Sequence, residues 1–201
     1  MNDDEPFRML LAAGLAALFP IVLYHRIKAH RPEPLDRRQE GPFVLATLRP
    51  LGITFMICVI LYLVNPARMA WSAFALPAWV RWAGLCLLPP CGVLLFWTLR
   101  SLGTNLTDTV VTRKVHTLVV RGPYRWVRHP FYCSVGLMIL AASLVAANWF
   151  LMITGALALA VMVVRTPTEE AKLVERFGDD YRRYMDATNR FMPTLRARRV
   201  R

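Results

Sequence analysis

Long apolar segments separated by short polar segments make up most of the chain. Five of them are long enough to cross the hydrocarbon core of a bilayer, about 30 Å thick, as α-helices that rise about 1.5 Å per residue. They cover residues 7–27, 43–64, 78–99, 130–147 and 148–164, so the last two meet at Asn148 in a very tight hairpin. The pattern predicts an all-α, polytopic membrane protein with five transmembrane helices in a single membrane domain, residues 1–201.

The region after the fifth apolar segment predicts a helix of another kind. Thr166 and Glu169 have the spacing of a capping box, with Pro167 at the first helical position, so a new helix is expected to begin there. Farther along, apolar and aromatic residues recur at helical spacing opposite a charged face: Leu173, Phe177, Tyr181 and Tyr184. This spacing predicts a C-terminal amphipathic helix on the cytoplasmic face of the membrane.

Composition supports a membrane protein. Of the 201 residues, 56% are hydrophobic, the mean hydropathy is +0.37, and 25 Lys and Arg against 13 Asp and Glu give a net charge of +12. A disordered chain is excluded because it could not be this apolar. A nucleic-acid-binding module would have this large positive net charge, but such modules rarely contain so high a fraction of hydrophobic residues.

The positions of the Lys and Arg residues along the chain decide between a membrane protein and a nucleic-acid-binding module. Five fall after the first apolar segment, six between the third and fourth, and ten after the fifth, so 21 of the 25 lie on one side of a five-span arrangement. This distribution obeys the positive-inside rule and predicts an N-terminus outside and a C-terminus in the cytoplasm. We therefore expect an integral membrane protein, of a bacterial inner membrane or its equivalent, that does not bind nucleic acid.

Two polar groups of residues lie next to the last two apolar segments. His129 directly precedes the fourth segment and is surrounded by aromatic residues on which an adenine or nicotinamide ring could stack. Arg125 and Arg128 are assigned to anchoring at the headgroup interface. Arg165 and Glu170 follow the fifth segment close to the membrane, where unpaired charge is unfavourable, so either a mutual ion pair or a functional role is expected.

Several common sites are missing from the sequence. No G-x-G occurs, so a Rossmann-type nucleotide site is not expected. The four histidines are scattered without acidic or cysteine partners at ligand spacing, and no metal site is predicted.

Two separated motifs carry a family resemblance. Residues 118–132, LVVRGPYRWVRHPFY, resemble the GPY-x-x-x-RHP-x-Y motif of the isoprenylcysteine carboxyl methyltransferase (ICMT) family, which is related to phospholipid N-methyltransferases. Residues 165–193 resemble that family's R-x-x-x-EE…RFG-x-x-Y-x-x-Y…RF-x-P ending. The resemblance covers about the last hundred residues and places the cofactor-binding half at residues 101–195.

The resemblance implies a membrane methyltransferase that uses S-adenosylmethionine and a lipophilic or small acceptor. It implies Arg165 and Glu170 as the catalytic pair. The cofactor-binding residues carried over from the family are Leu118, Val119, Tyr124, His129, Tyr132, Glu169 and Glu170.

The acceptor stays open at this point. Arg165 can orient a carboxylate through a bidentate contact, whereas Glu170 can take the proton of an amine or thiol. Phospholipid, isoprenoid acid, quinone-like lipid and small thiol are all compatible with the sequence. The alternatives to a methyltransferase are an NADPH-dependent membrane reductase related to sterol reductases, which share the RHP-x-Y element, and a non-enzymatic protein whose polar loops bind a partner.

Overall fold

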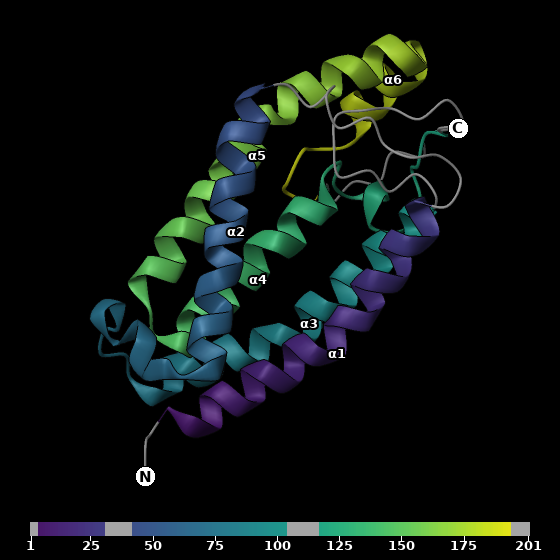
Figure 1. Cartoon of the computed structure of the whole chain (residues 1–201). Coiled ribbons are helices and arrows are strands. Elements are labelled where there is room, and N and C mark those ends of the chain that lie inside the picture. The colour runs from purple at the N-terminus through teal and green to yellow at the C-terminus, as the bar shows by residue number, and fades with distance from the viewer. Residues whose placement is uncertain (1–3, 31–41, 104–116, 194–201) are drawn as a thin grey trace.

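The regular elements in the described part of the chain are helices (Figure 1). The structure is a computed structural model that describes residues 4–30, 42–103 and 117–193. The long helices are α1 (Glu5–His30), α2 (Pro42–Val64), α3 (Ala78–Leu102), α4 (Pro130–Ala146) and α5 (Trp149–Phe177), followed by the short helix α6 (Asp179–Ala187). Two 3-10 turns, η2 (Pro66–Ser72) and η4 (Gly122–Arg125), lie in the connections. The predicted all-α fold is confirmed.

Each predicted apolar segment corresponds to one of the first five helices. Four of them, α1, α2, α3 and α5, are long and apolar enough to cross a membrane. The helix α4 is apolar but has 17 residues, about 25 Å, which is the lower limit for a span. The chain is therefore an all-α polytopic membrane protein, with four full-length spans and one short apolar helix among the residues that the structure describes.

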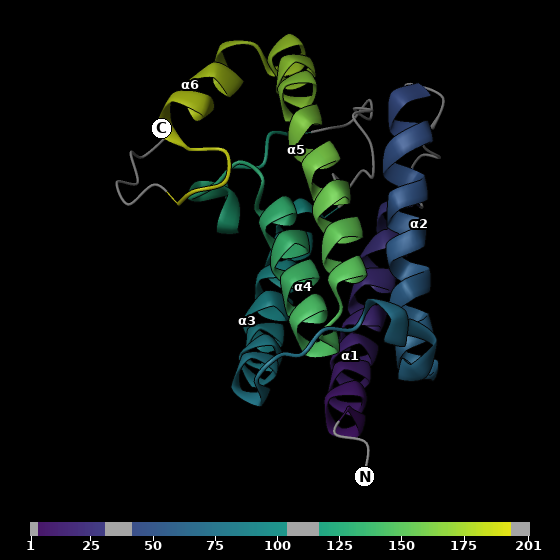
Figure 2. The same cartoon turned by 90° about the vertical axis from the view of Figure 1, so that its left-hand side faces the viewer.

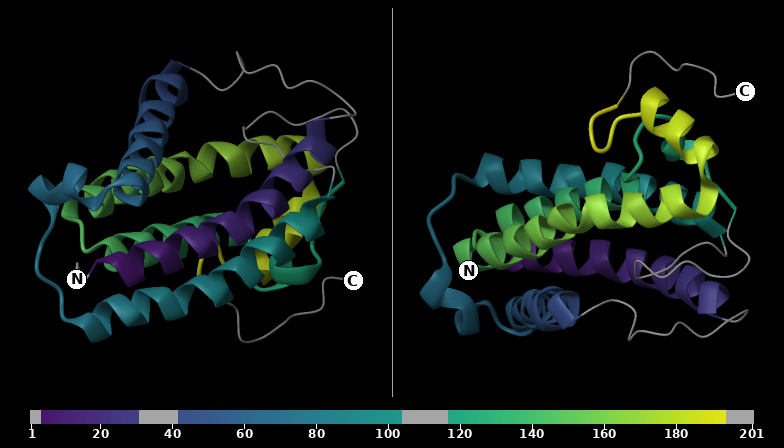
Figure 3. Two further views of the ribbon diagram at one scale, coloured as in Figure 1. Left: turned by 60° about the horizontal axis from the view of Figure 1, so that its bottom comes forward. Right: turned by 90° about the horizontal axis from the view of Figure 1, so that it is seen from above.

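The helices form a bundle in which α4 is central. It lies between α3 and α5 and packs against both (Figure 2). The helix α2 packs against α5 but is inclined to the others, so that it is seen nearly end-on where α1, α3 and α5 lie lengthwise (Figure 3). The short helix α6 folds back over the end of the bundle where α4 begins.

The apolar core lies at the end of the bundle opposite α6. Buried side chains from the first turns of α1, the last turns of α2 and α4, and the start of α5 pack together there. The α4–α5 hairpin is held at the same end by Asn148, whose side chain accepts a hydrogen bond from the Leu151 amide and donates to Ser72 Oγ. The predicted tight turn at Asn148 is confirmed.

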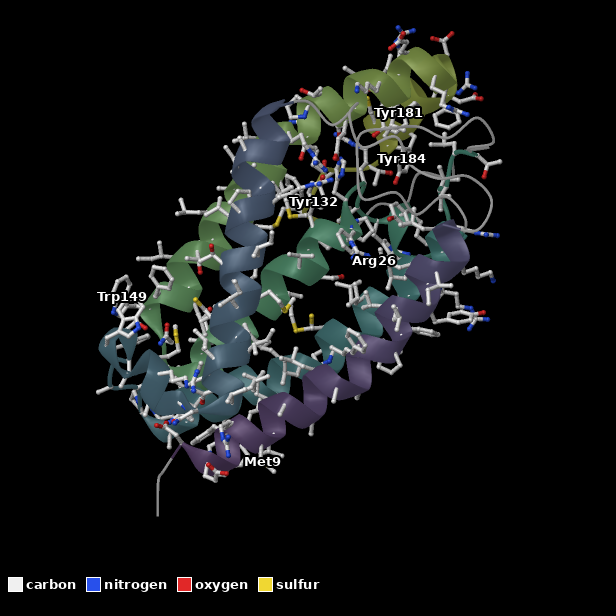
Figure 4. The ribbon with its side chains drawn as sticks, in the orientation of Figure 1. Met9, Arg26, Tyr132, Trp149, Tyr181 and Tyr184 are labelled. Carbon is white, nitrogen blue, oxygen red and sulfur yellow. The ribbon has the colours of Figure 1, made fainter. Side chains whose placement is uncertain are left out.

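The cationic helix ends lie at the opposite end, beside α6. Arg26, near the end of α1, lies at the same end as Tyr181 and Tyr184, away from Met9 and Trp149 (Figure 4). Arg31, Arg37, Arg38, Arg113, Lys114 and the cations after residue 193 lie outside the described residues. The described part of the chain is consistent with successive helices that cross the membrane in opposite directions. Which end of the bundle faces the cytoplasm stays a prediction.

The helix expected to begin at Pro167 does not exist as a separate element. The helix α5 runs without interruption from Trp149 to Phe177, with Pro167 inside it. The Thr166 hydroxyl donates to the carbonyl of Met162 within the same helix, instead of capping a new one. The prediction of a capping box is wrong because helix continuity here depends on tertiary contacts, and neighbouring helices can make up for the hydrogen bond that proline removes.

The predicted amphipathic helix is divided by Gly178. This glycine has a φ of 56°, a conformation that favours glycine, and it ends α5. Leu173 and Phe177 therefore belong to α5, and only Tyr181 and Tyr184 lie on α6, where both are buried. Arg182 and Arg183 stay exposed on the other side of α6, so the amphipathic character is confirmed for this shorter helix.

The contact between α3 and α4 makes a testable prediction about stability. A Cβ placed on Gly84 would lie 3.0 Å from Leu144 Cβ and 3.2 Å from the Ala141 carbonyl oxygen. We expect Gly84→Val to force the helices apart and to lower the stability by about 1–3 kcal/mol. Thermal unfolding in detergent measures this effect. Gly52→Val is the matched control because nothing lies within 4 Å of its Cβ position, and equal losses in the two variants would contradict the close helix contact.

Candidate active site

Three segments far apart in the sequence meet where α4 begins. They are the residues before and within the first turn of α4, the last third of α5, and the segment after α6. His129 is the N-cap residue directly before α4, and Pro130 occupies the first helical position, where no intrahelical partner exists for the N–H that proline lacks. Figure 4 shows Tyr132 of α4 at the same end of the molecule as Tyr181 and Tyr184 of α6.

Glu170 is the most deeply buried charged residue of this region, with 2% of its surface exposed. Its Oε1 lies 2.7 Å from Arg128 Nε and 3.2 Å from His129 Nε2, and its Oε2 lies 2.9 Å from Arg190 Nε. Two guanidinium groups and an imidazole thus surround one carboxylate. A buried charge is tolerated only where such partners and hydrogen bonds compensate its lost hydration.

Glu169 forms a second charged group on the adjacent side of α5. The Tyr132 hydroxyl lies 2.7 Å from both Glu169 oxygens, and Arg165 Nη2 lies 2.5 Å from Oε1 of the same carboxylate. Arg165 Nη2 also lies 3.2 Å from the Tyr132 hydroxyl. The other two nitrogens of this guanidinium, Nε and Nη1, are buried and have no hydrogen-bond partner within the described part of the chain.

His129 connects the two groups. Its Nε2 faces Glu170, and its Nδ1 lies 4.0 Å from Glu169 Oε2. The imidazole stacks on the Tyr132 ring, with 5.3 Å between ring centroids and 28° between the planes. Phe191 adds a third ring, 5.8 Å from the ring of His129. The site therefore combines aromatic faces with buried carboxylates and guanidinium groups.

The segment after α6 is bonded directly to the residues before α4. The amides of Arg128 and His129 donate to the carbonyls of Asn189 and Arg190, at 2.9 and 3.0 Å. Arg128 Nη1 also donates to the carbonyl of Met185, at 3.0 Å, and to that of Thr188. Arg128 thus joins α5, α6 and the start of α4 through one side chain.

A pair of tyrosines supports this arrangement from the other side. The Tyr184 hydroxyl donates to the carbonyl of Tyr124 at 2.6 Å. Burial raises the pKa of Tyr184 and that of Tyr124 above the usual value, so both hydroxyls keep their protons at neutral pH. Tyr184 can therefore donate this hydrogen bond over the whole physiological range.

The structure brings most of the predicted site residues together. His129, Tyr132, Glu169 and Glu170 are in mutual contact through the network described above. Tyr124 adjoins it through Tyr184. By contrast, Leu118 and Val119 lie half-buried in the segment that leads to η4, and their role in cofactor binding stays a prediction.

The expected ion pair between Arg165 and Glu170 is wrong. Arg165 pairs with Glu169, and Glu170 pairs with Arg128 and Arg190. Residues five apart on a helix point about 140° away from each other, whereas residues four apart are neighbours. His129 and Glu170 are also in direct contact, so no hollow separates these two side chains.

Arg128 is the residue whose role the sequence failed to reveal. Its assignment to headgroup anchoring is wrong, because only 8% of its side chain is exposed and it pairs with Glu170. Arg190 and Phe191 belong to the C-terminal motif, but the motif alone indicates no role for them. Their partners lie 20 or more residues away along the chain, and local patterns cannot show such contacts.

The contacts of Arg128 predict that this residue holds α6 in place. We expect Arg128→Ala to release α6 and to speed tryptic cleavage at Arg182 and Arg183, which are already exposed in the folded chain. Limited proteolysis with mass spectrometry of the fragments measures the cleavage rate. Arg125→Ala is the matched control, since Arg125 is exposed on the same loop. If the two variants were cleaved at the same rate, Arg128 would not hold the helix.

Comparison with known proteins gives two findings. The sequence pattern of the isoprenylcysteine carboxyl methyltransferase (ICMT) family matches residues 82–175, which include His129, Arg165, Glu169 and Glu170. No curated protein sequence matches the chain significantly.

The second finding concerns the fold. The chain is similar to the solved structure of the eukaryotic intramembrane Ras methyltransferase ICMT, with a TM-score of 0.54 and 19% sequence identity over 92% of this chain and 68% of that one. At this identity the likeness shows the shared fold. The predicted resemblance to the ICMT family is confirmed for residues 82–175, and the fold of the chain is similar to that of the solved ICMT structure.

Proposed function

We propose that the protein is an S-adenosylmethionine-dependent methyltransferase whose acceptor is the carboxylate of a lipophilic molecule. The observation that carries this proposal is the buried guanidinium of Arg165. It is fixed by Glu169 and Tyr132 through one nitrogen, and its other two nitrogens have no partner among the described residues. Buried donors without partners are unfavourable unless a ligand satisfies them.

The residues present fit the methyl donor. When bound, S-adenosylmethionine supplies a methyl group on a positively charged sulfur, and transfer of that group neutralises the charge. The stacked rings of His129, Tyr132 and Phe191 offer faces for an aromatic base and for a cation. The Glu169 carboxylate, at the edge of these rings, offers an acceptor for an ammonium group.

The surroundings of the two carboxylates favour a carboxylate acceptor over an amine or a thiol. Glu170 is held by two guanidinium groups and an imidazole, and Glu169 by Arg165 and a tyrosine hydroxyl. The oxygens of Glu170, the carboxylate that would take the proton of an amine or a thiol, are already occupied by these donors. A carboxylate acceptor needs no base, because its oxygen is already ionised when it attacks the methyl carbon.

Arg165 has the geometry to orient such an acceptor. Nε and Nη1 of Arg165 lie on different edges of the guanidinium, so one carboxylate oxygen can accept a hydrogen bond from Nη1 while Nε is left for another acceptor. Its position on α5 lies about 24 Å from the start of that helix, which places it near the end of the hydrocarbon core. An acceptor with its apolar part in the bilayer therefore presents its carboxylate at the level of this side chain.

Ligand binding provides the first test. We expect S-adenosylhomocysteine to stabilise the purified protein in detergent, by about 2.7 kcal/mol at a hundredfold excess over its Kd. His129→Ala should weaken this effect, because it removes a ring of the aromatic surface, whereas the exposed Arg182→Gln should not. Stabilisation by NADPH in the same assay, with none from S-adenosylhomocysteine, would instead favour a reductase.

The type of acceptor provides the second test. Membranes that contain the protein are incubated with a methyl-labelled donor, and the labelled lipid fraction is then treated with alkali. A methyl ester releases volatile methanol, whereas methylated amines and thiols keep the label. We expect release, and we expect Arg165→Lys to lower incorporation about 10- to 100-fold, the effect of one charged hydrogen bond.

Two controls belong to the second test. Arg165→Lys should leave the stabilisation by S-adenosylhomocysteine largely intact, which separates loss of acceptor binding from loss of the fold. Arg182→Lys, on the exposed face of α6, should incorporate label at the original rate. Label that resists alkali would contradict the carboxylate acceptor while leaving the methyltransferase proposal in place.

A further inference from the structure

A cavity of about 570 Å³ lies outside the active site, on the outer side of α3. One wall is apolar and consists of Val93, Phe96 and Trp97, which lie along one face of that helix at a spacing of three and four residues. All three side chains are exposed at the surface of the described chain. Because α3 is one of the membrane-crossing helices, this wall faces lipid.

Two cations lie at one end of this cavity, the end that is farther from the apolar core. Arg100 comes from the last turn of α3, and Arg121 comes from the residue before η4, so two segments converge there. Both side chains are exposed, and within the described residues neither has an ion pair or a hydrogen bond to a carboxylate. The carboxylates of the active site are already paired with other cations.

The position of the second cation is fixed by a close backbone contact. Gly122 begins η4 with a φ of 62°, and a Cβ placed on it would lie 2.2 Å from Ser101 Oγ and 3.1 Å from Trp97 Nε1. The backbone next to Arg121 is thus packed directly onto α3. Ser101 itself is held by a hydrogen bond to the Trp97 carbonyl at 2.8 Å. The cavity is therefore a formed feature of the fold, with its two cations held on one side.

We propose that this cavity binds an anionic phospholipid of the surrounding leaflet. Its phosphodiester headgroup would bind to Arg100 and Arg121, and its acyl chain would lie along Val93 and Phe96. A guanidinium matches the oxygens of a phosphate, and basic pockets at the ends of transmembrane helices are sites for anionic headgroups. The volume is within the range of small-molecule sites.

The combination of groups excludes simpler occupants. With the described residues alone, a neutral lipid would place no anion beside the two guanidinium groups, and a soluble phosphate would leave the apolar wall uncovered. An amphiphile with an anionic head and an apolar chain satisfies both. The ring of Trp97 packs against that of Trp126, at 5.3 Å between centroids, and Trp126 comes directly after η4. A lipid bound here would therefore stabilise the loop that leads to His129.

This inference does not depend on the proposed enzymatic function, and neither does its test. The full chain, purified in a neutral detergent, is titrated with phosphatidylglycerol, with phosphatidylcholine of the same acyl chains, and with inorganic phosphate. The thermal unfolding temperature and the number of lipid molecules retained in native mass spectrometry are measured. The variants are Arg100→Gln/Arg121→Gln and, as a control that removes the same charge, Arg182→Gln/Arg183→Gln on α6.

We expect phosphatidylglycerol to raise the unfolding temperature and to be retained, with about tenfold or greater loss of affinity in the cavity variant. The control variant should bind the lipid as the original chain does. Both substituted pairs are exposed, so folding is preserved and the comparison stays informative. Equal losses in the two variants would overturn the proposal, because they would show a general charge effect.

Phosphatidylcholine and inorganic phosphate distinguish the proposed anionic phospholipid from a neutral lipid and from free phosphate. Equal stabilisation by phosphatidylcholine would overturn the role of the two cations. Equal stabilisation by inorganic phosphate at millimolar concentration would overturn the assignment to a lipid. A second variant, Val93→Trp, fills the apolar wall without changing any charge. It should also weaken retention of phosphatidylglycerol, and unchanged retention would contradict the position of the acyl chain.

Discussion

The neutralisation of one buried carboxylate determines how the functional end of this protein is assembled. Glu170 lies within α5 with almost no exposed surface, its charge is balanced by Arg128 and Arg190, and His129 Nε2 lies within hydrogen-bond distance of the same carboxylate. These partners come from the start of α4 and from the segment after α6. Because an uncompensated charge in such a position is strongly unfavourable, the three segments are stable only together.

The rest of the site depends on that constraint. Once Arg128 is drawn to Glu170, its remaining donors reach the carbonyls at the end of α6, and the backbone of residues 189 and 190 pairs with the residues before α4. Phe191 is then brought against His129 and Tyr132. The apolar core at the other end of the bundle fixes the helices, while the polar end forms an aromatic and charged surface that suits the proposed methyl donor and lipophilic carboxylate.

Much of the fold could be predicted from the sequence because membrane helices are set by local hydrophobicity. The five apolar segments, the turn at Asn148 and the first helical position of Pro130 all depend on residues close together in the chain. The end of the helix that the fifth segment forms could not be predicted. Pro167 and Thr166 have the pattern of a helix start, but α5 continues through both residues and packs against α2 and α4.

Most of the candidate residues that the motifs indicate lie together in the structure, but their pairing was not predicted. Two motifs identify His129, Tyr132, Glu169 and Glu170, yet the partner of each charge depends on the path of the chain through α6. We infer that Arg128 and Glu170 act as one unit in forming the proposed donor site. A double-mutant cycle with Arg128→Gln, Glu170→Gln and both, read out as the Kd of S-adenosylhomocysteine, tests it most directly. We expect a coupling free energy of about 1 kcal/mol or more between the two side chains, and additivity within about 0.5 kcal/mol would contradict this joint role.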